Sequence, residues 1–333
     1  MYYGEGELVL GNKLNISIIT PIIEINGVMD RLVELGEVKY LPDPNTDDLK
    51  KIENSNILFT NPNKTKVYLG FNELKNFYNL AVIVTASTGT VHIDTDYCKE
   101  KNIQVINLSK EYETLRKISS TAELALTGTL AACRRYIECV NDARDNNIWD
   151  YENYVGRQIL GRKVGVIGYG RLGSMYAKYM LALGAEVFVY EKNNNILIDS
   201  GCVVLNSVEE IFMKCEIISL HIHAETENIK LINKNVLSYA DPNLILVNTS
   251  RGEIVNEFDI VEFLKINKSA SYVTDVISNE SFARRESPLY SNEIPDDQLI
   301  ISQHIGGMTS DAQRMAYNRA VDLLEDYLKK DST

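Results

Sequence analysis

The chain has 333 residues, 45% of them apolar and 24% charged, which suits two domains of ordinary size with the composition of soluble globular proteins. This length and composition exclude disordered, collagenous and disulfide-stapled small scaffolds. Lysine and arginine number 34 against 46 aspartates and glutamates, and the resulting charge of −12 predicts no nucleic acid and no anionic membrane surface as a partner.

The cysteine pattern indicates a reducing compartment. There are five cysteines, an odd number, and none forms a CxxC pair. The N-terminal segment lacks the basic and apolar regions of a secretory signal, and no apolar run approaches the roughly 18 residues of a membrane span. We therefore expect a cytoplasmic protein.

Short apolar runs that alternate with helix-like stretches predict a first α/β unit. We expect strands at 16–19, 38–41, 57–60, 80–85 and 103–106, and a helix at 29–35 that stops at Gly36. Ser120 and Glu123 form the pattern of a capping box, which predicts a helix from about residue 119 towards Tyr136. Residues 141–157 are mostly polar, and we interpret them as a surface connection.

A second run of strands follows that connection. We expect strands at 163–167, 186–190, 217–220, 244–247, 272–275 and 299–302, and a last helix at 310–329. Strands that alternate with helices in this way predict an α/β fold with parallel sheets.

A glycine-rich motif follows the strand at 163–167. Gly168 allows a tight turn, Gly170 lets the backbone approach a pyrophosphate, and Gly173 lets the next helix pack on the strand. Glu191 closes the following strand about 20 residues on, where it can accept hydrogen bonds from ribose hydroxyls and repel a 2′-phosphate. The context predicts NAD rather than NADP, although Lys192 could soften that repulsion. A plain turn and a solvated strand end are the alternatives.

Three polar clusters come directly after predicted strands. They contain Arg251, then Asp275 with Glu280, then His304. A histidine beside a carboxylate can move the proton that accompanies a hydride, and an arginine can hold a substrate carboxylate. This set predicts interconversion of a 2-hydroxy acid and a 2-oxo acid. Taken singly, each residue could instead be a surface ion-pair partner, a strand-end cap or a structural histidine.

Other residues are interpreted more plainly. His92, His221 and His223 each suit a structural role, and His221 with His223 lacks a third ligand, so no metal site is predicted. Thr121 could contact a nicotinamide or only start a helix. Lys64 and Lys66 could meet an anionic substituent of the substrate, although we favour a solvated loop for them.

The order and spacing of these segments resemble the D-isomer-specific 2-hydroxyacid dehydrogenases, a family with a phosphoglycerate dehydrogenase branch. The resemblance runs from about residue 80 to the C-terminus. The matching segments are STGTVHID at 87–94, STAELAL at 120–126, GRQILGRKVGVIGYGRLG at 156–173, LHIHAET at 220–226, VNTSRGEIVNE at 247–257 and HIGG at 304–307.

The resemblance implies a fold of two Rossmann-like or flavodoxin-like domains with parallel sheets and the active site in the interdomain cleft. Residues 1–108 and 310–333 would form a discontinuous substrate domain, and 109–309 the NAD-binding domain. It also implies a homodimer and a small anionic 2-hydroxy or 2-oxo acid as substrate.

The resemblance also implies roles for individual residues. His304 would be the acid/base, Glu280 its partner and Arg251 the carboxylate ligand, joined by the backbone of Thr88 and Gly89. Cofactor contacts are expected from the following residues: Gly168, Gly170, Arg171, Leu172, Gly173, Glu191, His221, Thr226, Asp275, His304, Gly306 and Gly307.

The chain departs from the family pattern at four positions. Val91 stands where an aspartate is usual, and His223, Ser281 and Gln303 stand where prolines are usual. The alternative function is an NAD(H)-sensing interaction protein on the same fold with little turnover. The intact set of Arg251, Glu280 and His304 favours the enzyme.

Overall fold

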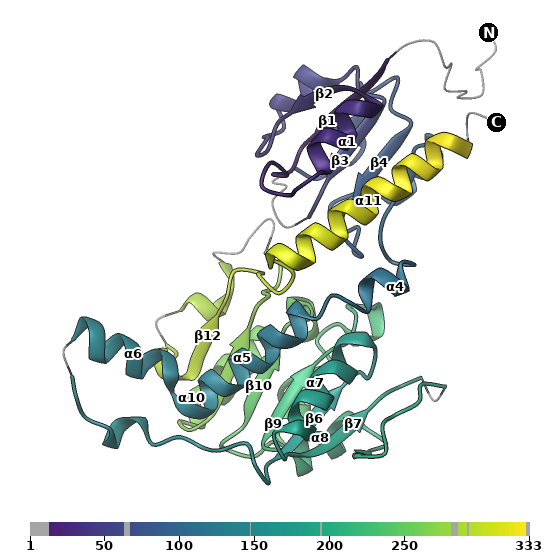
Figure 1. Cartoon of the computed structure of the whole chain (residues 1–333). Helices are drawn as coiled ribbons and strands as arrows, with labels where there is room; N and C mark the ends of the chain where they lie inside the picture. Colours follow the sequence, from purple (N-terminus) through teal and green to yellow (C-terminus); the bar gives the residue numbers. More distant parts are fainter. Residues whose placement is uncertain are drawn as a thin grey trace. The chain divides into compact units, whose positions relative to one another are not determined.

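The computed structural model describes residues 13–62, 67–146, 148–193, 195–280, 286–291 and 293–330 (Figure 1). Lys64, Lys66 and Ser281 lie outside the described residues. The chain divides into two compact units: unit 1 comprises Met1–Ile118 and Thr309–Thr333, and unit 2 comprises Ser119–Met308.

Unit 1 is built on a parallel sheet of five strands in the order β2-β1-β3-β4-β5, the order of flavodoxin-like folds. The C-terminal helix α11 packs in this unit although nearly 200 residues separate it from the rest. The elements are β1 (Leu14–Ile18), α1 (Val28–Leu35), β2 (Gly36–Tyr40), η1 (Asp48–Ile52), β3 (Ile57–Thr60), α2 (Phe71–Leu74), β4 (Val82–Thr85), α3 (Thr95–Glu100), β5 (Gln104–Ile106), α4 (Tyr112–Leu115) and α11 (Ser310–Lys330).

Alternating side chains of this sheet enter two separate cores. Ile57 and Phe59 of β3 face α1 and α11, and Val321 and Leu324 of α11 are fully buried against that face. Leu58, between them in sequence, joins the opposite core under η1, α2 and α3. Because both faces are covered, the strands are apolar on both sides, as parallel strands usually are.

Unit 2 is built on a seven-stranded parallel sheet in the order β12-β11-β10-β9-β6-β7-β8. The strand order reverses between β6 and β9, as in doubly wound dinucleotide-binding folds. The elements are α5 (Ser120–Arg134), α6 (Tyr136–Asp145), η2 (Glu152–Tyr154), β6 (Lys163–Ile167), α7 (Arg171–Ala182), β7 (Glu186–Tyr190), β8 (Cys202–Val204), α8 (Val208–Lys214), β9 (Ile217–Leu220), η3 (Thr226–Asn228), α9 (Lys234–Leu237), β10 (Ile245–Asn248), η4 (Gly252–Ile254), α10 (Glu257–Ile266), β11 (Ser271–Thr274), η6 (Pro288–Tyr290), η7 (Asp296–Gln298) and β12 (Leu299–Ile301).

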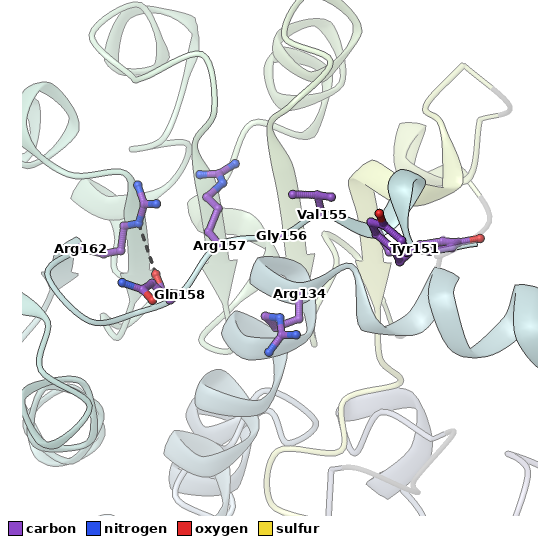
Figure 2. Close-up of a pocket in the computed structure, with 8 residues that line it drawn as sticks. Arg134, Tyr151, Val155, Gly156, Arg157, Gln158 and Arg162 are labelled. Carbon is purple, nitrogen blue, oxygen red and sulfur yellow. Dashed lines mark hydrogen bonds between the residues drawn. The ribbon is translucent and has the colours of Figure 1, made fainter. Parts of the chain in front are cut away.

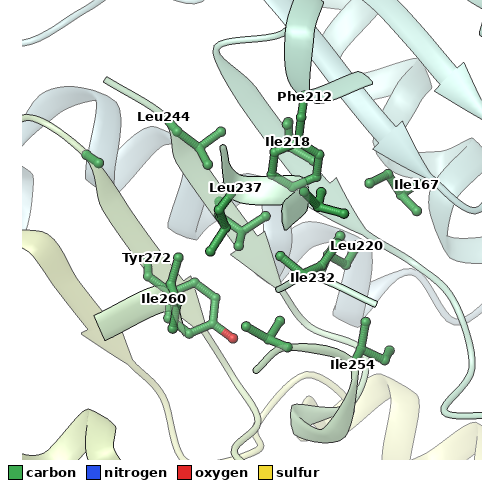
Figure 3. Packing of buried hydrophobic residues seen from close by; sticks show 14 of the residues in the cluster. Ile167, Phe212, Ile218, Leu220, Ile232, Leu237, Leu244, Ile254, Ile260 and Tyr272 are labelled. Carbon is green, nitrogen blue, oxygen red and sulfur yellow. The ribbon is translucent and has the colours of Figure 1, made fainter. Parts of the chain in front are cut away.

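This sheet also separates two cores. Figure 3 shows the core under α8, α9 and α10, where Ile218 and Leu220 of β9 meet Phe212, Ile260 and other apolar side chains. Val164 and Val166 of β6 point to the other face, towards α5 and α7. Because apolar side chains cover both faces of the sheet, the polar side chains of the candidate site lie at its carboxyl edge.

The prediction of two α/β units with parallel sheets is confirmed, with differences in detail. The predicted capping box is wrong: α5 already includes Ser120, whose buried hydroxyl has no hydrogen-bond partner in the described chain, and Ser119 Oγ bonds to Glu123 instead. Residues 141–145 belong to α6 rather than to a connection, because a polar sequence with no buried residue still continues the helix.

His92 in unit 1 predicts a measurable pH dependence of stability. Its ring nitrogens are buried without a hydrogen-bond partner among the described residues, and burial lowers the pKa of His92 to about 4. In the unfolded chain the imidazole of His92 is protonated below about pH 6.5, whereas in the folded chain it is protonated only near pH 4. The free energy of unfolding therefore falls as the pH drops from about 6.5 towards 4. We expect His92→Leu to recover about 2 kcal/mol of this loss at pH 5, as measured by urea denaturation at pH 7 and pH 5. The exposed His223 is the matched control; an equal effect of His223→Leu would contradict the assignment to His92.

Candidate active site

The polar residues predicted for unit 2 follow the carboxyl ends of neighbouring strands. The loops come after β6, β9, β10, β11 and β12, which are adjacent in the sheet. In open α/β sheets, ligands bind at this edge, next to the point where the strand order reverses. The loops after β6 and β9 flank that point.

The glycine-rich loop after β6 has no room for a side chain at two of its glycines and open space beside the third. Gly168 has a φ of 90°, and a Cβ there would lie 2.6 Å from the carbonyl oxygen of His221. A Cβ on Gly173 would lie 2.0 Å from the carbonyl oxygen of Gly168. Gly170 directly precedes α7, and a Cβ on it would meet no other part of the molecule within 4 Å.

This open space fits a dinucleotide. The first N–H groups of α7 meet no side-chain cap, and no acidic residue lies in the first turn, which begins with Arg171 and Leu172. A helix N-terminus of this kind stabilises phosphate through free N–H groups and the helix dipole. The loop can therefore hold the pyrophosphate of NAD.

Glu191 lies just beyond β7 with its carboxylate turned to the glycine-rich loop. Oε2 accepts a hydrogen bond from Tyr169 N at 2.7 Å, and Oε1 accepts one from Asn193 N at 2.8 Å. An ionised carboxylate has about four acceptor sites, so two remain for ribose hydroxyls. Lys192, the next residue, forms an ion pair with Glu227 of η3.

His221 and Thr226 lie in the segment after β9. His221 Nε2 is 2.9 Å from Ser219 Oγ, and the imidazole lies against Tyr176 with ring centroids 5.2 Å apart. Burial lowers the pKa of His221 to about 3, so its ring is neutral at physiological pH. His221 thus packs against Gly168 and Gly173 of the glycine-rich loop. Thr226 is the first residue of η3.

The loop after β10 presents Arg251. Asn248 organises this turn, because its Oδ1 accepts from Ser250 N at 3.0 Å and its Nδ2 donates to the Arg251 carbonyl at 2.9 Å. Arg251 Nη1 donates to the carbonyl oxygen of Ser250 at 2.7 Å. A Cβ on Gly252 would lie 2.0 Å from the carbonyl carbon of Ile277, so this loop contacts the one that leads to Glu280.

Glu280 and His304 form a hydrogen-bonded pair between the loops after β11 and β12. Glu280 Oε1 bonds to His304 Nδ1, and about one third of each side chain is exposed. No described group is bonded to His304 Nε2, so this nitrogen is available to a substrate. His304 has a φ of 54°, in the left-handed region, which requires support from its surroundings.

Asp275 supplies that support. Its carboxylate accepts hydrogen bonds from Ser302 Oγ at 2.5 Å, Ile305 N at 2.8 Å and Gly306 N at 2.8 Å. Its carbonyl oxygen accepts a fourth from His304 N at 2.9 Å. The residue expected at the nicotinamide carboxamide therefore also holds the loop of His304.

Glycine at 306 permits close contact with α5. A Cβ there would lie 3.1 Å from both Asp275 Oδ2 and Thr121 Cγ2. Gly307, by contrast, has open space around it. Thr121 thus lies beside the HIGG segment as well as in the first turn of α5.

Sequence reasoning missed three supporting residues: Asn248, Glu257 and Ser302. The carboxylate of Glu257 is buried and accepts from Ser278 N and from Ser287 Oγ, both at 2.6 Å, which anchors the segment before Glu280. Asn248 and Ser302 could have been found from the sequence, because each is a polar residue at the carboxyl end of a strand. A buried glutamate on a helix has no local signal.

Thr88 and Gly89 belong to unit 1. They follow the carboxyl end of β4, where Ser87 Oγ donates to the Gly89 carbonyl at 2.7 Å and the Thr88 side chain is exposed. Val91, where the family usually has aspartate, is 72% exposed. The role of Thr88 and Gly89 in binding a carboxylate stays a prediction.

Unit 2 also has an arginine-lined cavity of about 580 Å³ (Figure 2). Arg157 donates to the carbonyl oxygens of Asn243 and Ser269, just before β10 and β11, and Arg162 pairs with Glu216 just before β9. These contacts place the cavity at the amino ends of the strands. It lies at the opposite edge of the sheet from the candidate site, and two of its arginines hold the chain together there.

The described residues offer no ready metal site. They contain no group of three histidine, cysteine or acidic side chains placed to hold a metal ion. They also contain no helix long and apolar enough to cross a membrane.

Comparison with known proteins identifies the region of the site. Residues 126–306, more than half of the chain, match the family model of the D-isomer specific 2-hydroxyacid dehydrogenase, NAD binding domain. Hydroxypyruvate reductase from Blautia hydrogenotrophica is 26% identical over 286 residues, which cover 84% of each chain. D-3-phosphoglycerate dehydrogenase from Mycobacterium leprae is 29% identical over 71% of this chain, but the match spans only 43% of that enzyme.

Solved structures agree in fold. A Thermus thermophilus protein has a TM-score of 0.81 at 26% identity, covering 95% of this chain and 97% of its own. D-lactate dehydrogenase from Aquifex aeolicus, in complex with NAD and lactic acid, has a TM-score of 0.76 at 24% identity, covering 95% and 96%. The cofactor predicted from the glycine-rich loop is confirmed by the family model, which is that of an NAD-binding domain.

The hydrogen bonds of Asp275 lead to a structural prediction. Asn at this position keeps the shape but turns one acceptor oxygen into a donor NH₂, which faces Gly306 N or Ile305 N. We expect Asp275→Asn to speed amide hydrogen exchange at Ile305 and Gly306 by about tenfold, since a lost buried hydrogen bond costs about 1–3 kcal/mol. Asp94→Asn is the control, because Asp94 caps α3 in unit 1. Unchanged exchange at both amides in Asp275→Asn would show that its carboxylate does not hold this loop.

Proposed function

This chain belongs to the D-isomer specific 2-hydroxyacid dehydrogenase family, and we propose that it is an NAD-dependent oxidoreductase interconverting a D-2-hydroxy acid and a 2-oxo acid. The observation that carries the proposal is the hydrogen bond between Glu280 and His304 Nδ1, on loops that follow adjacent strands of the NAD-binding domain. The substrate is a small anion of the 2-hydroxy or 2-oxo acid class.

His304 moves the proton in this reaction. Glu280 accepts the Nδ1–H, which fixes the tautomer and leaves Nε2 to exchange a proton with the substrate oxygen. NAD, if bound along the glycine-rich loop and Glu191, would supply or take up the hydride. In the direction of reduction His304 Nε2 gives a proton to the substrate carbonyl oxygen, and in the direction of oxidation it takes the proton from the substrate hydroxyl.

Arg251 binds the substrate carboxylate. Its guanidinium has five N–H donors in a planar fork, and Nη1 is already turned to the Ser250 carbonyl, which orients the group. The remaining donors suit a carboxylate. The backbone N–H groups of Thr88 and Gly89 are proposed as further donors to it, and Asp275 as a partner of the nicotinamide carboxamide.

The remaining cofactor contacts follow the geometry of the carboxyl edge. We assign the pyrophosphate to the loop from Gly168 to Gly173, with Thr226 beside it. Gly307, which has open space around it, leaves room close to His304 in the chain for the nicotinamide end, and Gly306 lets this segment approach α5. The five cysteines are free, which supports a cytoplasmic location.

Kinetics of site variants test the proposed activity. We expect the wild type to oxidise NADH with at least one member of a panel of 2-oxo acids that includes hydroxypyruvate and phosphorylated analogues. His304→Asn should lower kcat by about 10²–10⁴-fold, because the group that transfers the proton is removed. Arg251→Lys should raise KM for the oxo acid, because the fork is lost.

The exposed His223 provides the control, and His223→Asn should retain wild-type rates. An equal rate for His304→Asn and the wild type would refute the acid/base role. Tight NADH binding with no turnover of any oxo acid would favour the NAD(H)-sensing alternative.

We also propose that the protein is a homodimer assembled through unit 2. No residue of α6 is buried, and α6 with the segment after it runs out from the layers around the sheet (Figure 1). Trp149 is 95% exposed, and large apolar side chains gather along this arm: Tyr136, Ile137, Val140, Ile148, Tyr151 and Val155. Exposed apolar side chains concentrated in one segment in this way are typical of a protein interface.

Sedimentation velocity tests the homodimer. The wild type should sediment as a species of twice 37.6 kDa, and Trp149→Glu should shift it towards the monomer, because a charge would be buried at the interface. Leu197→Glu is the matched control, since Leu197 is also an almost fully exposed apolar residue of unit 2 but lies away from the arm. A wild type that sediments at 37.6 kDa at micromolar concentration would overturn the dimer.

A further inference from the structure

An ion pair joins two loops that lie on either side of the glycine-rich loop. Lys192 comes directly after Glu191, beyond the end of β7, and Glu227 lies in η3, beyond the end of β9. β7 and β9 are the two strands that flank β6. The bond between Lys192 Nζ and Glu227 Oε1 therefore joins the loops on either side of the glycine-rich loop.

The charges at this place decide whether a 2′-phosphate is tolerated. Glu191 accepts hydrogen bonds from Tyr169 N and Asn193 N, which hold its carboxylate beside the glycine-rich loop. A 2′-phosphate beside it would need a cation. Lys192 is the adjacent cation, and it is turned to Glu227 instead.

We propose that Glu227 is a specificity-determining residue that excludes NADP by holding Lys192 away from the ribose 2′-position. This inference rests on the proposed function of the site. Glu191 alone repels the phosphate, but a free Lys192 would offset that repulsion. By engaging the ammonium group, Glu227 leaves the negative charge of Glu191 uncompensated.

The surroundings of Lys192 support this role. Its pKa is raised above the ordinary lysine value, first by the hydrogen bond with Glu227 and also by the charges of Glu227 and Glu225. Both side chains of the pair are more than half exposed. Loss of the pair should therefore leave the fold intact, because exposed ion pairs contribute little to stability.

Cofactor titration of the full chain tests the inference. The Kd values of NADH and NADPH are measured by the change in cofactor fluorescence, and their ratio is compared between variants. Glu227→Gln should lower the ratio of the NADPH to the NADH Kd by about threefold to fivefold, the size expected for one exposed charge. The change should lie mainly in NADPH, because NADH has no group at the 2′-position beyond the hydroxyl.

Two further variants separate the ion pair from a general loss of negative charge. Glu225→Gln removes the same charge from a neighbouring position that makes no bond to Lys192, and it should change the ratio by less than half as much. The double variant Glu227→Gln with Lys192→Met should return the ratio to the wild-type value or above, because the effect acts through the lysine.

The outcomes are distinct. A wild-type ratio in Glu227→Gln, or equal changes in Glu225→Gln and Glu227→Gln, would overturn the inference. So would a double variant that keeps the lowered ratio. Failure of the wild type to bind NADH at all would overturn the proposed function itself, whereas NADH binding with an unchanged ratio removes only the role of Glu227.

Discussion

The buried carboxylate of Asp275 is the interaction on which the candidate site depends. It gathers Ser302, Ile305 and Gly306 around two oxygens, while its own carbonyl accepts from His304. These bonds hold the histidine in a left-handed backbone conformation that it would not adopt unsupported. The imidazole can then meet Glu280 from the neighbouring loop. In the proposed role of His304, a proton-transfer group held in this way would need no reorganisation before it acts.

Close backbone contacts also hold loops together elsewhere along the carboxyl edge. Gly252 lets the loop of Arg251 touch the loop of Glu280, and Gly168 lets the chain pass the carbonyl of His221. Each contact excludes a side chain at one position and thereby brings two loops together. The edge of the sheet is thus a set of loops in mutual contact, which explains how residues from five strands can serve one small ligand.

Part of this edge carries a positive charge, although the net charge of the protein is negative. The chain carries −12 overall, yet Arg251 and His304 lie at the end of the edge where we propose that a small anion binds. At the other end lie Glu191 and Glu227, with Lys192 paired to Glu227. Under the proposed function, one end of this edge would favour a carboxylate and the other would disfavour a phosphate.

Local sequence patterns determined the regular elements closely. The expected strands at 57–60, 163–167, 186–190 and 217–220 coincide with β3, β6, β7 and β9, because continuous β-branched and apolar runs are buried on both faces. The glycine spacing and the polar residues after strands also located the candidate site. Less was visible where burial provides no pattern: α6 has no buried residue, and β8 is a three-residue strand at the edge of the sheet.

The partnerships within the site belong to the folded chain. Glu280 and His304 are 24 residues apart, and Lys192 and Glu227 are 35 apart, so no local periodicity connects them. Strand order brings their loops together, and strand order follows from long-range packing of the helices on both faces of the sheet. The resemblance in the sequence already named Glu280 as the partner of His304, but the pairing of Lys192 with Glu227 had no signal in the chain and was decided by the neighbours of each strand.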